Sequence, residues 1–492
     1  MIIDRIYEWA RIAPSKTALI HNDVVIDYAT FARTIETLRK TLERHDLPAG
    51  TIAVVLVSHL ADAWALVFAL RDLGLTTIQV RSLAQAKALA IRNISCVVTT
   101  AAEQSAHDLA GTPLVGAKII VVARPDLAAT QWDELPLAPQ RSRPSGGHVL
   151  YTSGTTGTPK KLMWDSELED ARSSVRSHSD GHDSAAVVHT LNYELRTGIG
   201  WKTRLSVWQA GGCLIIDQRP ERYERFFRHG VTCARMTVGA FRWLVAVNKF
   251  NLDASIGCDL WVGGGAMGAD LASKAIAKFD RAVSIYSRYS SSELVTPALT
   301  SRIQSLDDML WLRPAPDRTI EIVDDGGHEC SPGEEGDLRI LRTQLDWQCY
   351  LDDAEATAKV FRDGFFYPGD RAVRRADGRI RILGRIADVL NVQGNKFAVG
   401  PIEQRIQQYL EVDEVCVFSG LNAAGQNEVV IAIKSDNEPA KERLDFIRRE
   451  FGKFDKVRFS VLREFPRTEA GTGKVRRAEL RKVLFSEPAD KS

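Results

Sequence analysis

The sequence predicts an α/β fold. A large N-terminal domain of two doubly wound αβ subdomains plus a small β-barrel-like part is expected, followed by a small mobile α+β C-terminal domain. Three observations support this. In about the first half of the chain, short β-branched runs alternate with apolar stretches at helical spacing. Farther on, short alternating strands are separated by Asp-Gly and Pro-Gly turns. The length of 492 residues exceeds one ordinary hydrophobic core.

The first subdomain begins with an amphipathic pattern over residues 31–42, which predicts a helix. Residues 52–57 (Ile-Ala-Val-Val-Leu-Val) are typical of a buried parallel strand. The remaining elements expected in this subdomain are a helix over 60–73 and strands over 76–80, 96–99 and 119–122. A second round of alternation predicts strands over 185–190, 213–217 and 232–236 and a helix over 201–209.

The residue pattern changes from about residue 320, where short strands with alternating apolar residues are expected over 320–323, 336–341 and 379–383. A compact unit then follows, with strands over 388–392, 415–418 and 428–434 and helices over 401–409 and 440–451. We therefore predict a large domain over 1–383, a hinge over 384–388 and a small domain over 389–492. The last has a normal size for a separate domain.

Composition excludes several classes of partner. Lysine plus arginine (64) nearly balance aspartate plus glutamate (63), so no global charge favours nucleic acid or membrane binding. Seven scattered cysteines without a Cys-x-x-Cys pair indicate free thiols rather than zinc or disulfides. The N-terminus lacks the pattern of a signal peptide, and apolar stretches are too short to span a bilayer. A cytoplasmic monomer or homodimer is expected.

The most informative motif is Tyr151–Lys161, which reads Tyr-Thr-Ser-Gly-Thr-Thr-Gly-Thr-Pro-Lys-Lys. A loop rich in glycine and hydroxyl residues can turn several N–H groups and hydroxyls toward one anion. Lysine adds a compact positive charge. The common P-loop is excluded because only two residues separate Gly154 from Gly157. The motif predicts a triphosphate cradle, with a solvated linker as the alternative.

Further motifs follow in an order that resembles the adenylate-forming superfamily, which includes acyl- and aryl-CoA synthetases, peptide-synthetase adenylation domains and luciferases. Each motif alone is weak, but their ordered occurrence is specific, and the chain is identified as a member. The landmarks after the phosphate loop are Gly263-Gly264-Gly265-Ala266-Met267, Tyr289-Ser290-Ser291-Ser292-Glu293, Tyr367-Pro368-Gly369-Asp370, Gly384-Arg385 with Asp388, and Gly471-Thr472-Gly473-Lys474.

The resemblance implies ATP and Mg²⁺ as cofactors and assigns roles to matching residues. The phosphates would be held by Thr152, Ser153, Gly154, Thr155, Thr156, Gly157 and Lys160. Glu293 and Thr155 would bind magnesium, Tyr289 would stack on adenine, and Ser292, where the family usually has threonine, would reach the α-phosphate. Gly264 would lie beside the acyl pocket. A plain surface carboxylate remains the alternative for Glu293.

Three more roles are carried over to the second half of the chain. Asp370 would accept both ribose hydroxyls, and Arg385 would lie near the ribose and phosphates. Lys474, on a glycine-containing loop, would bridge the acid carboxylate and the transferring phosphate as a catalytic residue. The alternatives are a turn aspartate that caps its own backbone and, for Lys474, a solvated basic tail.

The chain departs from the family pattern in two places. Ala387 occupies the usual pivot position, with Asp388 next to it, and Asn192-Tyr193-Glu194-Leu195-Arg196 lacks the aromatic-His pair of many relatives. Gly394 matches a glycine beside the pantetheine arm of CoA-forming members. Arg196 or Arg288 could pair with a second anionic group of the substrate, although an ordinary ion pair is favoured.

Two features are interpreted as structural. The segment His178–Asp183 is expected to be a polar loop rather than a metal site, and Trp201, Trp208 and Trp243 are expected to lie in the core.

The resulting hypothesis is an ATP- and Mg²⁺-dependent acid–thiol ligase of the AMP-forming acyl-CoA synthetase type. It would act on a small-molecule carboxylic acid, with coenzyme A as the first choice of acceptor. The alternatives are a phosphopantetheinyl carrier protein as acceptor, an amine or other nitrogen acceptor, and a non-catalytic nucleotide-binding relative. The sequence does not identify the acid.

Overall fold

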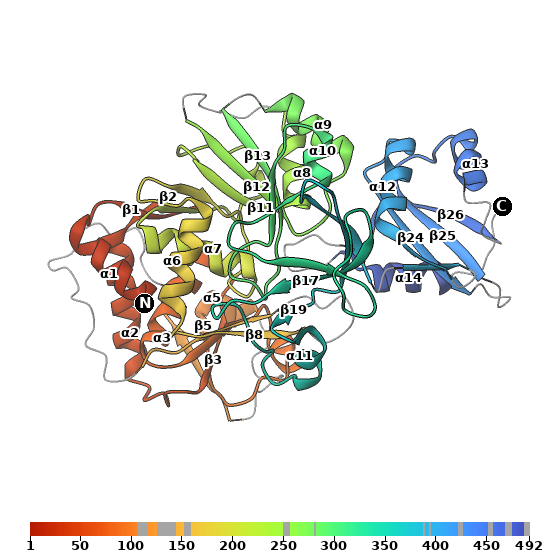
Figure 1. Cartoon of the computed structure of the whole chain (residues 1–492). Coiled ribbons are helices and arrows are strands. Elements are labelled where there is room, and N and C mark those ends of the chain that lie inside the picture. Colours follow the sequence, from red (N-terminus) through yellow and green to blue (C-terminus); the bar gives the residue numbers. More distant parts are fainter. Residues whose placement is uncertain are drawn as a thin grey trace.

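The computed structural model confirms the predicted α/β fold (Figure 1). The residues described are 1–106, 116–124, 144–151, 159–248, 256–279, 282–386, 389–392, 395–421, 427–450, 456–467 and 475–486. Among them, no helix combines the length and apolar character needed to cross a membrane.

The first sheet has six strands in the order β6-β5-β3-β4-β7-β8. All neighbours are parallel except β8, which returns antiparallel to β7. The strands are β3 (Ile52–Leu56), β4 (Thr76–Gln79), β5 (Ile94–Thr100), β6 (Lys118–Val122), β7 (His148–Tyr151) and β8 (Lys161–Trp164). The β-branched pattern at 52–57 therefore forms the expected buried parallel strand, β3.

The second sheet has nine strands in the order β15-β14-β13-β12-β11-β9-β10-β1-β2, parallel in its centre and antiparallel at both edges. The strands are β1 (Thr17–His21), β2 (Val24–Asp27), β9 (Val187–His189), β10 (Cys213–Ile216), β11 (Cys233–Thr237), β12 (Cys258–Gly263), β13 (Val283–Tyr289), β14 (Leu299–Arg302) and β15 (Arg313–Pro314).

Helices connect and cover these sheets, and α6 and α7 lie between them in Figure 1. The helices of this region are α1 (Ile2–Ile12), α2 (Tyr28–Glu43), α3 (Leu60–Asp72), α4 (Leu83–Ala88), α5 (Ala101–Ala106), α6 (Glu169–Asp180), α7 (Gly198–Ala210), α8 (Val238–Ala246), α9 (Ala269–Lys278) and α10 (Leu306–Leu310), with a 3-10 turn at Pro220–Arg222. Two of them match predicted helices closely, α2 over 31–42 and α3 over 60–73.

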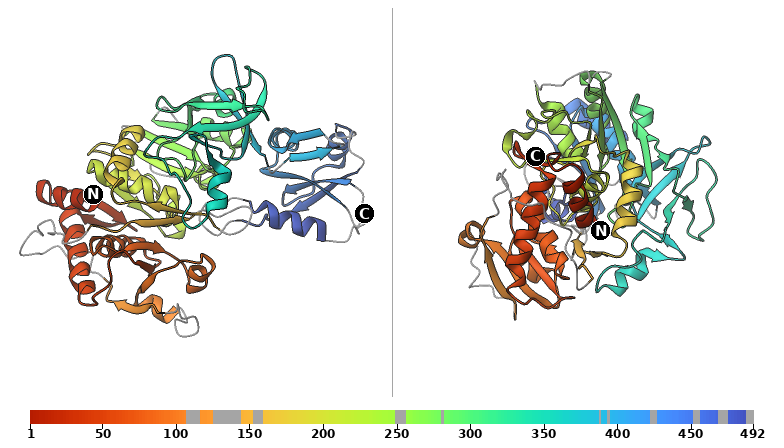
Figure 2. Two further views of the ribbon diagram at one scale, coloured as in Figure 1. Left: turned by 60° about the horizontal axis from the view of Figure 1, so that its bottom comes forward. Right: turned by 90° about the vertical axis from the view of Figure 1, so that its left-hand side faces the viewer.

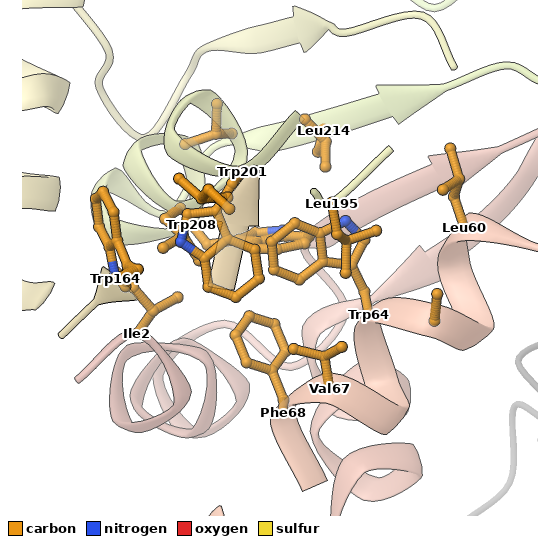
Figure 3. Close-up of a cluster of buried hydrophobic side chains, with 14 of the residues drawn as sticks. Ile2, Leu60, Trp64, Val67, Phe68, Trp164, Leu195, Trp201, Trp208 and Leu214 are labelled. Carbon is orange, nitrogen blue, oxygen red and sulfur yellow. The ribbon is translucent and has the colours of Figure 1, made fainter. Parts of the chain in front are cut away.

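A cluster of tryptophans forms the centre of the core between the sheets (Figure 3). The ring of Trp64 on α3 stacks on Trp201 of α7 at 4.8 Å and meets Trp208 edge-on at 4.9 Å. The predicted burial of Trp201 and Trp208 is confirmed. The same prediction for Trp243 is wrong, because its side chain on α8 is 67% exposed.

The β-rich part that follows is a six-stranded antiparallel sheet in the order β18-β19-β17-β20-β21, with β16 beside β17. Its elements are β16 (Ile320–Val323), β17 (Glu335–Leu341), α11 (Ala354–Val360), β18 (Phe361–Arg362), β19 (Phe365–Phe366), β20 (Asp370–Arg374) and β21 (Ile380–Arg385). In the described part of the chain, β18 and β21 do not pair with each other, so the sheet is open rather than a closed barrel.

The C-terminal elements stand apart from the rest in the left view of Figure 2. They are β22 (Val389–Val392), β23 (Asn395–Ala398), α12 (Val399–Leu410), β24 (Glu414–Leu421), β25 (Asn427–Lys434), α13 (Lys441–Glu450), β26 (Val457–Leu462) and α14 (Arg477–Ser486). They have their own small core around Ile406, Val417 and Ile431. The predicted boundaries at 383/384 and 388/389 remain predictions.

Candidate functional site

Three predicted site residues meet where β13, β20 and β21 come together. Tyr289 ends β13, and its hydroxyl donates to Asp370 Oδ2 at 2.5 Å. Asp370 begins β20 and lies directly opposite Arg385, the last residue of β21. Arg385 Nε is 3.1 Å from Asp370 Oδ1, and Arg385 Nη1 donates to the Pro368 carbonyl at 2.5 Å. A phenol, a carboxylate and a guanidinium are thus placed side by side by two sheets.

The electrostatics of this group keep the phenol protonated. Burial and the charge of Asp370 raise the pKa of Tyr289 well above its usual value. Asp370 itself is buried, whereas the Arg385 side chain is about half exposed. Of these two partners of Asp370, the guanidinium is the one that faces solvent.

A second group gathers around Glu293, which is also buried. Its Oε1 accepts from the Tyr350 hydroxyl at 2.6 Å, and its Oε2 accepts from Ser291 Oγ. Lys160 Nζ lies 4.8 Å from the centre of the Tyr350 ring, within range of a cation–π interaction. The structure thus links Lys160 to Glu293 through a residue that the sequence did not indicate, Tyr350.

The two groups are close enough to influence each other. Burial and the nearby charges of Asp370 and Glu293 raise the pKa of Tyr289. Burial and the charge of Glu293 likewise raise the pKa of Tyr350, while Arg385 counteracts this. The described site residues therefore form one electrostatically coupled cluster.

Glycines permit close approach at two points of the site. A Cβ on Gly198, at the start of α7, would lie only 3.3 Å from Ser292 Oγ and 3.2 Å from Lys202 Cε. Gly264 follows β12 with φ +78°, in the left-handed region that favours glycine. Gly263 is opposite Arg288 in the register of the neighbouring strands β12 and β13. Gly264 and Tyr289 each come directly after one of these two residues.

Several predicted residues lie outside the described part of the chain: Thr152, Ser153, Gly154, Thr155, Thr156, Gly157, Ala387, Asp388, Gly394 and Lys474. The residues that frame two of these segments are described. Tyr151 and Lys161 are opposite each other on β7 and β8, and Arg467 forms a bridge with Val475. The phosphate-loop motif therefore connects two antiparallel strands.

The two arginines considered for substrate recognition are both engaged in ion pairs. Arg196 pairs with Glu194. Arg288 Nη2 lies 2.7 Å from Asp180 Oδ1, and both side chains are buried. The favoured interpretation of ordinary ion pairs agrees with these contacts.

Asp180 also corrects the interpretation of His178–Asp183 as a polar loop. His178 to Asp180 form the end of α6, and the Asp180 side chain is 1% exposed. It is paired with Arg176 at 2.7 Å and Arg235 at 3.1 Å as well as with Arg288. Burial alone would raise the pKa of Asp180, but these three guanidinium groups hold this pKa well below its usual range.

Buried cations outnumber buried carboxylates in the region behind the site. Among the described residues, the interacting buried cations are Arg172, Arg176, Lys202, Arg235, Arg288 and Arg318, and the buried carboxylates are Asp180, Glu293, Asp346 and Asp370, while Arg71 and Glu169 form a further balanced pair at 2.7 Å. In a low-dielectric interior, a surplus of positive charge attracts anions. The chemistry of this region fits a negatively charged ligand such as a metal–nucleotide complex.

Sequence reasoning missed the residues that support the site from farther along the chain. Tyr350 has no motif around it, and Lys202 is a lysine in a helix, which normally faces solvent. One signal was available. Lys202 is accompanied on α7 by the apolar residues Trp201, Leu205 and Trp208, which occur on several sides of the helix. That distribution is typical of a fully buried helix.

The chain also resembles known proteins in sequence. A family model described as AMP-binding enzyme matches residues 6–345. Human mitochondrial acyl-coenzyme A synthetase ACSM5 is 26% identical over 362 residues, which span 68% of this chain but only 60% of the relative's length.

Solved structures resemble the chain over nearly its whole length. The anthranilate CoA ligase AuaEII in complex with anthranoyl-AMP has a TM-score of 0.79 at 17% identity, covering 98% of this chain and 96% of its own. The amide bond synthetase McbA from Marinactinospora thermotolerans has a TM-score of 0.80 at 19% identity, covering 98% and 99%. At these identities the likeness concerns the fold.

Proposed function

Because the chain belongs to the family of AMP-binding enzymes, we propose that it activates a carboxylic acid with ATP and Mg²⁺ and then transfers the acyl group to a thiol. The acid carboxylate attacks the α-phosphorus of ATP, the bond to the β-phosphate oxygen breaks, and pyrophosphate leaves. A thiol sulfur then attacks the acyl carbon, its proton is lost, and AMP leaves. Coenzyme A is the first choice of thiol.

The observation that carries this proposal is the joining of the Tyr289–Asp370–Arg385 group with the Glu293–Tyr350–Lys160 group. The first offers an aromatic ring beside a carboxylate, which suits a nucleoside with vicinal hydroxyls. The second offers a buried carboxylate next to a lysine, which suits magnesium bound to phosphates. The buried positive charge behind both groups favours the anionic reactants.

Individual roles follow from this placement. Asp370 would accept the ribose hydroxyls, Tyr289 would face adenine, and Arg385 would contact ribose and phosphate from the solvent side. Glu293 would bind Mg²⁺ together with Thr155, and Lys160 would contact the outer phosphates with residues 152–157. Lys474 would approach the reacting carboxylate and α-phosphate, and Gly394 would allow the pantetheine arm to approach.

The test is acid-dependent exchange of pyrophosphate into ATP across fatty, aryl, amino and dicarboxylic acids, with Lys474→Ala beside the wild type. We expect exchange with one class of acid and its loss in the variant. If ATP binds but no acid supports exchange, the non-catalytic nucleotide-binding relative is favoured for the acid classes tested. If ATP does not bind either, the proposal is wrong.

The acceptor is decided by product mass. Incubation of the adenylate-forming mixture with free CoA, with a phosphopantetheinyl carrier protein or with an amine gives products of different mass. A thioester with CoA supports the first choice. A carrier-bound thioester or an amide would replace it, and the absence of the histidine of many relatives from residues 192–196 and the alanine at 387 make the amide worth including.

A further inference from the structure

The segment that follows β13 is held from behind through its backbone. From Ser291 to Thr296, every carbonyl accepts a hydrogen bond from outside the segment. Lys202 Nζ donates to Ser291 O at 3.2 Å, to Ser292 O at 3.3 Å and to Leu294 O at 2.7 Å. The remaining donors are the Trp347 N–H to Glu293 O at 3.2 Å, Arg176 Nη1 to Val295 O at 2.8 Å and Arg318 Nη2 to Thr296 O at 3.3 Å.

Lys202 makes the largest contribution to this arrangement. Its side chain is buried on α7, and it forms no ion pair with a carboxylate of the described residues. A buried ammonium without such a partner is costly unless all its protons are hydrogen-bonded. Burial and the charge of Arg176 lower the pKa of Lys202 well below its usual value, whereas Glu293 and Asp346 act against this. The three carbonyl acceptors around Nζ match the three N–H donors of the ammonium form. Lys202 therefore satisfies its full hydrogen-bonding capacity on this one segment.

The three acceptors lie on both sides of Glu293. They fix the backbone at residues 291, 292 and 294, and the Trp347 N–H fixes residue 293 itself. The direction of the Glu293 carboxylate follows from this backbone and from the contacts with Tyr350 and Ser291. A donor that sets the backbone on either side of a ligand also sets where the ligand atoms lie.

We propose that Lys202 is a positioning residue for the metal–nucleotide site, which holds the Glu293 carboxylate in place through the backbone of residues 291–294. This inference rests on the proposed function, because it assigns the held carboxylate to Mg²⁺. Lys202 Nζ donates to this segment. It acts through the segment, in the way that outer-shell partners of metal ligands act in other sites.

Two variants separate positioning from a general contribution to stability. Lys202→Met keeps an unbranched side chain that is one atom shorter and removes all three donors. Arg204→Met is the matched control, since Arg204 is also fully buried on α7 but donates through Nε to Thr190 Oγ1 at 3.1 Å and has no contact with the segment. Lys202→Gln, which keeps two N–H donors, serves if Lys202→Met does not fold.

The first measurement is amide hydrogen exchange in the ligand-free proteins. We expect faster exchange at residues 291–296 in Lys202→Met and not in Arg204→Met. Equal protection of the segment in wild type and Lys202→Met would overturn the inference without reference to any activity.

The second measurement is the affinity for ATP as a function of Mg²⁺ concentration, by calorimetry without any acid. We expect Lys202→Met to raise the Mg²⁺ concentration for half-maximal ATP binding about 10- to 100-fold, Lys202→Gln to raise it less, and Arg204→Met to leave it unchanged. An unchanged Mg²⁺ response in Lys202→Met overturns this inference alone. Wild-type protein that binds no Mg²⁺–ATP overturns the proposed function as well.

Discussion

The Tyr289 hydroxyl donates to the Asp370 carboxylate at 2.5 Å, although 81 residues separate the two along the chain. The contact joins the nine-stranded sheet, where Tyr289 ends β13, to the antiparallel sheet, where Asp370 begins β20. Each residue is at the end of a strand, so the hydrogen bonds of the sheet hold its backbone in only one direction along the chain. The hydrogen bond fixes the two strand ends relative to each other at the proposed nucleoside site.

This contact predicts an order of effects on ATP binding. Asp370→Asn removes a charged acceptor for the ribose hydroxyls. Since hydrogen bonds to charged groups contribute about 1.5–3 kcal/mol, ATP affinity should fall about 10- to 100-fold. Tyr289→Phe keeps the aromatic ring and leaves the Asp370 carboxylate in place. It should lower the affinity for ATP by less than about tenfold. Calorimetric titration with ATP checks both, and equal losses in the two variants would contradict the assignment.

Removal of the proposed metal ligand should change the Mg²⁺ requirement. Glu293→Gln has a neutral side chain of the same shape and should raise the Mg²⁺ concentration for half-maximal pyrophosphate exchange more than about 100-fold. Tyr350→Phe removes only the hydroxyl that donates to Glu293 and should raise this Mg²⁺ concentration about 10- to 100-fold. Exchange that is insensitive to Mg²⁺ in the wild type would refute the metal assignment.

Lys474→Ala should lower adenylate formation about 10²–10³-fold, the size of a lost transition-state donor. Arg476→Ala is the control for a merely basic tail, because Arg476 is about half exposed and pairs with Glu479 at 2.6 Å. It should leave the rate of pyrophosphate release near normal. A Lys474→Ala enzyme that matches the Arg476→Ala enzyme would exclude the catalytic role.

The carboxylate of Asp180 should be important for stability. Asp180→Asn leaves Arg176, Arg235 and Arg288 buried without their counter-charge, which we expect to cost about 3–5 kcal/mol of the free energy of unfolding. Asp170→Asn is the matched control on the same helix, since Asp170 is about half exposed and pairs with the N-terminal amine. Its cost should be under about 1 kcal/mol. Urea unfolding of both variants measures the difference.

Stability should fall in mild acid because of buried neutral histidines. Burial lowers the pKa of His189 from 6.5 to about 3, and its Nδ1 accepts from the Leu191 N–H at 3.0 Å. The pKa of His189 is lower in the folded than in the unfolded protein. The contribution of neutral His189 to the free energy of unfolding is therefore complete above pH 6.5 and is lost as the pH falls toward 3.

At pH 5 the loss from His189 amounts to about 2 kcal/mol relative to pH 7. His189→Asn keeps an acceptor at this position without a titrating ring. The difference in unfolding free energy between pH 7 and pH 5 should shrink by about that amount. An unchanged difference in the variant would show that His189 does not titrate in this way.

Much of the fold could be predicted because its signals are local. The β-branched run at 52–57 and the apolar helix at 60–73 are read from a few neighbouring residues, and they form β3 and α3. The predicted helix over 201–209 likewise lies within α7. Local periodicity did not distinguish Trp243 from Trp201, because exposure of α8 depends on what packs against it.

The support of the site could not be predicted for a related reason. Lys202 binds carbonyls about 90 residues away in sequence, and Asp180 pairs with Arg288 over 108 residues. Neither contact leaves a pattern of spacing. A lysine or an aspartate is normally solvated. The apolar residues around Lys202 indicate a buried helix, but only the assembled fold shows which groups the buried side chains contact. Motifs indicated site residues such as Glu293 and Asp370, and only the tertiary structure indicated supporting residues such as Lys202.

The anchoring of residues 291–296 has a consequence for how this protein can be altered. Lys202, the Trp347 N–H and Arg176 donate to main-chain oxygens, which every amino acid possesses. Arg318 donates both to the carbonyl and to the side-chain hydroxyl of Thr296. The path of the chain at residues 291–295 therefore depends on donors outside the segment, whereas the side chains of Ser291 and Ser292 matter for their own contacts with Glu293 and, as proposed, the α-phosphate. Directed evolution of acid preference or nucleotide affinity should reject changes in Lys202 and Arg176, because they alter the main chain around Glu293.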